Sequence, residues 1–287
     1  MGFLDFIAKP LGQFLFFIYK TIAFNNYGLA IIVFTFVIKL ILLPLTVKQY
    51  RSTSKMQEIQ RRYKNDKEKM NQELMKVYQE HKYNPASGCL PLLLQMPILL
   101  SLYWVINQPL KYLLGKTTAQ IDLLAEYVTK ALGKTAISYS REIGIVNYFN
   151  AHISELSNVS ELLKPTDLIN FNFLGLNLGI IPTIDTNVLF GPQSAVYLPL
   201  LLIPLLSVGT TYLSTKLMTP KASENKGKDG AGAQGTMALI GPLMTLMFSF
   251  TLPAGVGLYW TISNLFQIFQ QLYINKYVIK KKEVSEK

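Results

Sequence analysis

A single cation, Lys39, interrupts the apolar run 28–47, and Lys48 follows just beyond its end. A charge at membrane depth costs about 2.5–3.5 kcal/mol on insertion scales, so such residues usually have a partner or a water-filled cavity. If Val47 is the cytoplasmic end, Lys39 lies roughly 12 Å deep. Its extended side chain can then also snorkel towards the headgroups. The segment alone leaves both interpretations open, and both place it in a bilayer.

The net charge of +11 is unevenly distributed. Segment 48–85 carries ten Lys/Arg against five acidic residues, and 216–230 and the tail are also basic. Segment 109–194 carries six Lys/Arg against seven acidic residues. Half of the residues are hydrophobic, and they are bunched into runs between these segments. Basic segments that alternate with apolar runs follow the positive-inside rule of membrane proteins.

Runs of about 20 apolar residues predict transmembrane helices, because a hydrocarbon core about 30 Å thick needs that length. We therefore expect an all-α polytopic membrane protein, and the positive-inside rule places its N-terminus outside and its C-terminus inside the cell. The five predicted spans are 28–47, 88–108, 195–218, 237–252 and 253–277.

The remaining segments divide between the two sides of the membrane. We expect 1–27 to form an interfacial helix, with a retained signal anchor as the alternative. Segment 109–194 is predicted to be extracellular, with a helix near 118–132 and one or two short helices within 138–163. The Gly-, Lys- and Ser-rich segment 219–236 is predicted to be a cytoplasmic loop, and 278–287 a cytoplasmic tail.

The basic segment 48–87 has apolar residues at helical spacing, which predicts a helical hairpin projecting into the cytoplasm. Its cations can be a solvated helix face that sets topology, or a docking surface for anionic lipid or ribosomal RNA. The candidate docking residues are Arg51, Lys55, Arg61, Arg62 and Lys64.

Lys39, Gln95 and Gln267 are predicted to lie at similar depths, roughly 10–14 Å from the cytoplasmic face. Ser263 and Asn264 continue this polar track deeper in the fifth span. Hydrogen bonding between helices explains a glutamine well but a lysine poorly. We therefore favour one hydrophilic cavity, open to the cytoplasm and closed outside.

Several short motifs stand out: Asn84-Pro85, Gly88-Cys89-Leu90-Pro91, Gln95-Met96-Pro97-Ile98, Phe173-Leu174-Gly175-Leu176-Asn177-Leu178, Leu252-Pro253-Ala254-Gly255, Leu258-Tyr259-Trp260 and Asn264. Together they resemble the signature of the YidC membrane protein insertase family in its five-span form, which implies a location in the bacterial cytoplasmic membrane. The resemblance covers about residues 28–108 and 170–277.

The resemblance implies five helices around a hydrophilic groove, with Lys39 where the family has a conserved arginine. Lysine keeps the charge but loses the planar, multi-donor fork. Arg61 is a second departure, because many relatives have proline there. The predicted groove residues are Lys39, Gln95, Gln267, Ser263, Asn264, Trp260 and Tyr103.

The implied function is insertion of nascent, mostly small membrane proteins into the lipid bilayer without nucleotide hydrolysis. Expected partners are the nascent chains, the ribosome, the signal recognition pathway and a Sec translocon. No catalytic residues, cofactor or metal site is expected. The alternatives are an assembly scaffold and a small-molecule transporter; a transporter predicts an inverted repeat, which the sequence does not show.

Overall fold

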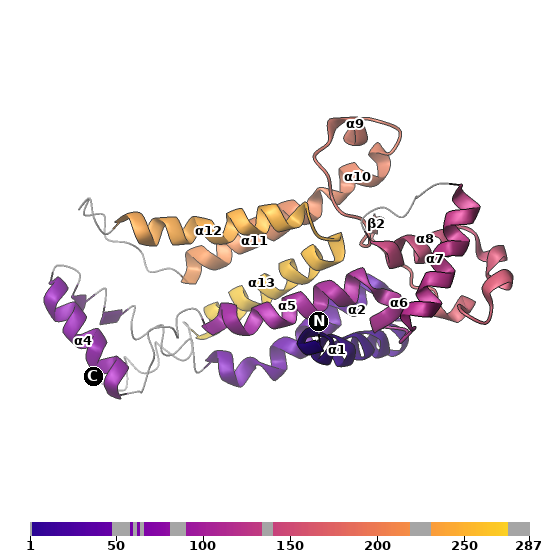
Figure 1. The fold of residues 1–287 in the computed structure, drawn as a ribbon. Coiled ribbons are helices and arrows are strands. Elements are labelled where there is room, and N and C mark those ends of the chain that lie inside the picture. The colour runs from indigo at the N-terminus through magenta and orange to yellow at the C-terminus, as the bar shows by residue number, and fades with distance from the viewer. Residues whose placement is uncertain are drawn as a thin grey trace. The chain divides into compact units, whose positions relative to one another are not determined.

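The computed structural model describes residues 2–47, 58–59, 62–63, 66–80, 90–133, 140–218 and 231–274. These residues are mostly helical, as expected for an all-α protein (Figure 1). Beside the helices they form one antiparallel strand pair, β1 (Asn172–Phe173) and β2 (Leu176–Asn177). The chain divides into two compact units. Unit 1 comprises Met1–Thr35, Pro97–Ser207 and Leu246–Trp260, and unit 2 comprises Phe36–Met96, Val208–Thr245 and Thr261–Lys287.

The helices agree with the sequence pattern in some places and differ in others. Helix α7 (Thr118–Leu132) confirms the helix predicted from apolar spacing. Helix α8 (Arg141–Ala151) and the 3-10 helix η2 (Ile153–Val159) confirm the short helices expected before Pro165.

Helix α12 (Ala231–Ser249) begins within the segment 219–236 that composition predicts to be a loop. Residues 231–236 are therefore helical. A local Gly-rich composition lowers helix propensity by up to about 1 kcal/mol per glycine, but a helix that continues into an apolar segment can outweigh it.

Helix α2 (Tyr27–Ile41) ends before the predicted end of the first apolar run. Leu42 is a turn residue, and a further helical turn covers 43–47. Pro44 explains the break, since its ring clashes with the carbonyl of residue 40 and it has no N–H to donate.

Helix α1 (Gly2–Thr21) packs closely against α6 (Pro109–Tyr112) within unit 1. A Cβ added to Gly12 would lie 2.5 Å from the carbonyl oxygen of Tyr112, so only glycine allows this approach. The hydroxyl of Tyr112 donates to the Asp5 carboxylate, and Lys111 Nζ lies 3.1 Å from the same carboxylate. These bonds hold the pKa of Asp5 below its usual range.

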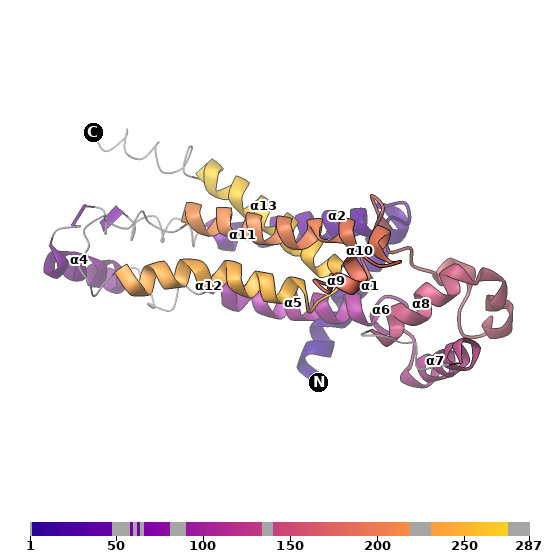
Figure 2. The same ribbon diagram turned by 90° about the horizontal axis from the view of Figure 1, so that it is seen from above.

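Helices α7 and α8 of unit 1 lie side by side (Figures 1 and 2). Thr117 and Gln120 form a capping box at the start of α7, and Gly133 ends this helix in the left-handed conformation. Both signals satisfy backbone groups that a helix end leaves unbonded.

Glu142 of α8 is buried and accepts a hydrogen bond from the Lys111 backbone N–H at 3.0 Å. The side chain of Gln108, the residue before α6, forms no capping hydrogen bond. The Glu142 carboxylate instead accepts from the N–H groups that the start of this helix leaves unbonded. Burial raises the pKa of Glu142 to about 7, against the opposing effects of the backbone N–H groups of Lys111 and Leu110.

The segment after the strand pair caps α13 (Ala254–Ile274). The backbone N–H groups of Ala254 and Gly255 donate to the carbonyls of Ile180 and Leu178, at 2.9 and 2.8 Å. Phe173 lies against Gly28, where an added Cβ would clash with its ring. The strand pair therefore sits at the N-terminal ends of both α2 and α13.

The remaining helices are α4 (Lys67–Glu80), α5 (Leu90–Asn107), α9 (Thr186–Leu189), α10 (Ser194–Leu200) and α11 (Leu202–Met218), with a short 3-10 helix η3 (Pro165–Asp167). Within the described residues, Ser194–Leu217 is long and apolar enough to cross a membrane. Tyr27–Ile41, Met96–Asn107 and Leu239–Ser249 are apolar but shorter.

Candidate functional site

Polar side chains gather on the C-terminal half of α13, in unit 2. Ser263 and Asn264 are buried, and Gln267 is half-buried. Residues 264, 267 and 271 are spaced three and four apart, which places them along one face of the helix. Buried polar side chains on such a face need hydrogen-bond partners on neighbouring helices.

Asn264 finds these partners on α11. Its Nδ2 donates to Thr211 Oγ1 at 2.8 Å and lies 3.3 Å from Thr210 Oγ1. Thr245 of α12 donates to the Gly241 carbonyl at 2.9 Å, and its hydroxyl lies 3.2 Å from that of Thr211. Asn264, Thr211 and Thr245, here called the three-helix network, therefore link α13, α11 and α12.

Gly241 of α12 faces α11. A Cβ at this position would meet Thr215 Oγ1 at 3.6 Å and the Thr211 methyl group at 3.8 Å, which are ordinary van der Waals contacts. The network is thus part of a packed helix interface.

Lys39 lies on α2, in the stretch where this chain segment runs alongside α13. The rings of Phe36 and Phe266 are 5.7 Å apart, and Gln270 Nε2 donates to Thr46 Oγ1 at 2.7 Å. Lys39 falls between Phe36 and Thr46, and Gln267 falls between Phe266 and Gln270. Both side chains are half-buried. Both predicted groove residues therefore lie close in sequence to these two contacts.

Two other predicted groove residues lie in unit 1. The Trp260 ring lies 6.2 Å from that of Phe248, and the Tyr103 ring lies 5.3 Å from that of Trp104. Trp260 and Tyr103 are both half-buried. Gln95 lies within α5, with its side chain outside the described part of the structure.

The predicted docking hairpin is described only in part. Helix α4 supplies its second arm, and Arg62 is exposed. Arg51, Lys55, Arg61 and Lys64 lie outside the described residues.

Sequence reasoning does not single out Thr211 and Thr245. The available signal is their position: each interrupts an apolar run, and their hydroxyls match the depth of Asn264. Threonine is nevertheless common in transmembrane helices, where it bonds its own backbone carbonyls. Only the helix pairing shows which threonines link helices.

Comparison with known proteins gives one consistent result. Residues 17–282 match the model of the family described as 60Kd inner membrane protein. A relative from Clostridium perfringens is 33% identical over 257 residues, covering 87% of this chain and 78% of the relative. A relative from Syntrophobacter fumaroxidans is 31% identical over 283 residues, covering 96% of this chain.

A relative from Haemophilus influenzae is 51% identical over 110 residues, which is 36% of this chain. All three relatives are named membrane protein insertase YidC. The chain spans 39% of the length of the Syntrophobacter relative and 20% of the Haemophilus relative. Since the family match covers most of the chain, the chain belongs to the 60Kd inner membrane protein family, that of the YidC insertases.

Proposed function

We propose that this protein is an insertase that moves nascent, mostly small membrane proteins from the cytoplasm into the lipid bilayer. Family membership supports the proposal, together with the apolar helices that interrupt the basic segments. The protein resides in the bacterial cytoplasmic membrane with five spans, its N-terminus outside and its C-terminus inside. Insertion proceeds without nucleotide hydrolysis, driven by transfer of the substrate's apolar surface into lipid.

The observation that carries the mechanism is the half-buried Lys39 on the segment whose Phe36 and Thr46 contact Phe266 and Gln270 of α13. A cation in this position attracts acidic groups of a substrate's N-terminal tail. Gln95 and Gln267 offer hydrogen bonds that replace those the tail loses with water. Partial entry of the tail lowers the desolvation barrier to crossing.

We propose different tasks for the polar residues of α13. The Asn264 amide donates a hydrogen bond to Thr211, so its main role is in helix packing. Gln267 lies closer to the cytoplasmic end and on the stretch paired with α2. We therefore place substrate contact at Lys39 and Gln267, with Ser263, Trp260 and Tyr103 as further groove residues.

The cytoplasmic hairpin and its partners complete the proposal. Arg51, Lys55, Arg61, Arg62 and Lys64 supply positive charge that docks the substrate and its delivery machinery. The ribosome and the signal recognition pathway deliver the nascent chain, and a Sec translocon cooperates for larger substrates. These contacts are electrostatic and weaken with salt.

Reconstitution tests the role of Lys39. Purified protein in vesicles is given a single-span substrate, and the protease-protected product is measured. Lys39→Ala should reduce insertion at least tenfold, which corresponds to about 1.4 kcal/mol of barrier height, whereas Lys39→Arg should retain it. Lys216→Ala, which removes an exposed lysine from the end of α11, serves as the matched control. Equal activity of all four proteins would exclude the charge from the mechanism.

The same assay separates insertion from assembly scaffolding. A scaffold binds the substrate but yields no protease-protected product in vesicles that contain no other protein. A protected product that depends on the protein therefore supports insertase activity.

A further inference from the structure

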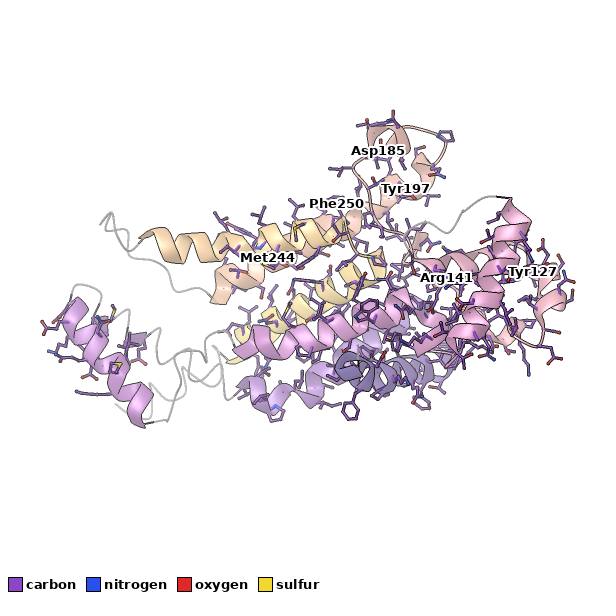
Figure 3. All side chains as sticks on the ribbon, in the orientation of Figure 1. Tyr127, Arg141, Asp185, Tyr197, Met244 and Phe250 are labelled. Atoms are coloured by element: carbon purple, nitrogen blue, oxygen red, sulfur yellow. The ribbon has the colours of Figure 1, made fainter. Side chains whose placement is uncertain are left out.

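The outer region of unit 1 has two halves of contrasting charge. Residues 109–167 contain twelve charged side chains, whereas 168–193 contain one, Asp185. Figure 3 shows Asp185 and Tyr197 together in the part formed by α9 and α10, and Arg141 and Tyr127 in the part formed by α7 and α8. The charged half is suited to water, and the other half lacks the charges that usually keep an outer loop solvated.

The uncharged half nevertheless exposes large apolar side chains. Leu174 is 86% exposed, Phe190 78% and Ile184 70%. Leu174 forms the turn between β1 and β2, and Ile184 and Phe190 flank α9. We call these three residues the outer apolar collar. Large apolar side chains this exposed, in a segment with a single charged residue, are what an interaction surface presents.

The collar residues belong to segments held at the N-terminal ends of apolar helices. The strand pair sits at the starts of α2 and α13, as described above, and α10 contacts both α9 and β2. Helix α10 is in turn the start of the span Ser194–Leu217. At about 1.5 Å per residue its 24 residues extend roughly 36 Å, which exceeds a hydrocarbon core of about 30 Å. The start of α10 therefore reaches the headgroup layer.

We propose that the outer apolar collar inserts into the outer-leaflet interface of the lipid bilayer, so that 168–193 rests on the membrane while α7 and α8 project into water. Lipid is the occupant that the position favours, because the collar residues precede the start of the span Ser194–Leu217 and their segment carries one charged residue. Asp185 is compatible with this position: its exposed carboxylate caps α9 by accepting from the Asn187 N–H and can face the headgroups.

The proposal concerns the position of this surface and depends on the proposed membrane orientation, not on insertase activity. It also explains how the start of the span is held. Apolar side chains at the headgroup level resist both withdrawal into water and deeper entry, as interfacial anchors do.

Fluorescent labels at single cysteines test this position. Cys89→Ser removes the native thiol, and Ile184→Cys, Phe190→Cys and Leu174→Cys are each labelled with an environment-sensitive dye. The labelled proteins are reconstituted in phosphatidylethanolamine–phosphatidylglycerol vesicles. Leu123→Cys on α7 is the matched control, since Leu123 is also an exposed leucine, at 54%, but lies in the charged half.

Emission at 174, 184 and 190 should shift to shorter wavelength and be quenched by lipids that carry a nitroxide near the headgroup. Emission at 123 should stay unshifted and unquenched. Labels at the collar that behave like the label at 123 would overturn the proposal. A wavelength shift without quenching by nitroxide lipids would also overturn the proposal, because the dye would then be shielded from water by protein and not by lipid. Since no substrate is added, a protein without insertase activity gives the same readout.

Discussion

At the scale of single residues, the structure shows that Asn264 holds helices together, whereas substrate contact at Lys39 and Gln267 is our proposal. Asn264 bonds two threonines of α11 and is buried. Lys39 and Gln267 are half-buried and lie where α2 and α13 run together. Asn264 and Gln267 look alike in the sequence, but their positions along α13 differ.

The three-helix network should stabilise the fold. Asn264→Ala and Thr211→Val each remove their shared hydrogen bond, and the coupling between them should be about 0.6–2 kcal/mol, the range found for such bonds in membranes. Thermal unfolding of the two single variants and the double variant in detergent micelles measures this coupling. Thr251→Val, at an exposed position, is the control. Additive effects of the two substitutions would show that the bond contributes nothing.

Glu142 should make the stability of the outer region depend on pH. Its pKa is raised from 4.5 to about 7, so between these values the folded protein keeps a proton that the unfolded chain loses. Rising pH therefore disfavours the folded state, by up to about 3 kcal/mol in total. The charges that oppose this shift are those of Lys111 and Arg141.

Glu142→Gln removes the titrating group while keeping an acceptor for the α6 backbone. Between pH 5 and 8 the wild-type protein should lose more stability than this variant, as measured by thermal unfolding at a series of pH values. Parallel stability curves for the two proteins would contradict the assignment.

At the scale of elements, α1 is an integral part of unit 1. Its buried face includes Ala8, Leu15 and Ile18, and Lys20 Nζ donates to the Thr166 carbonyl at 2.6 Å. The opposite face exposes Phe6 and Phe17, at 79% and 56%. A helix with one face packed on protein and aromatic residues on the other suits an interfacial position, which remains our proposal for this segment.

Gly12→Ala should detach α1 from α6, because its Cβ would meet the Tyr112 carbonyl oxygen at 2.5 Å. We expect a loss of about 1–3 kcal/mol, the usual cost of overpacking. Gly209→Ala on α11 is the matched control: nothing lies within 4 Å of its added Cβ. It should be neutral or stabilise by up to about 1 kcal/mol through helix propensity. Limited proteolysis and thermal unfolding distinguish the two variants, and equal stability would refute the steric argument.

At the scale of the whole molecule, the proposed function divides into docking and transfer. Deletion of residues 50–83 should slow insertion by weakening substrate docking, while the thermal unfolding of the remaining protein changes little. Raising the salt concentration should reduce insertion by the intact protein more than by the deletion variant, because it screens the hairpin cations. A deletion variant with unaltered insertion kinetics would make the hairpin a simple connector.

The sequence alone determined the features that depend on composition and local spacing. The alternation of apolar runs with basic segments, the helix at 118–132 and the family motifs are all local patterns, and the helix and the family are confirmed. Lys39 could be singled out for the same reason, because a single charge in an apolar run is visible in the sequence of one segment.

Tertiary structure decided which side chains meet. The pairing of Asn264 with Thr211, the closeness of Gly12 to Tyr112 and the burial of Glu142 join residues far apart in the chain. A polar residue in an apolar run shows only that some partner is needed, because every helix can supply hydroxyl or amide groups. The packing of helices selects the partner, and that choice depends on contacts that no single segment contains.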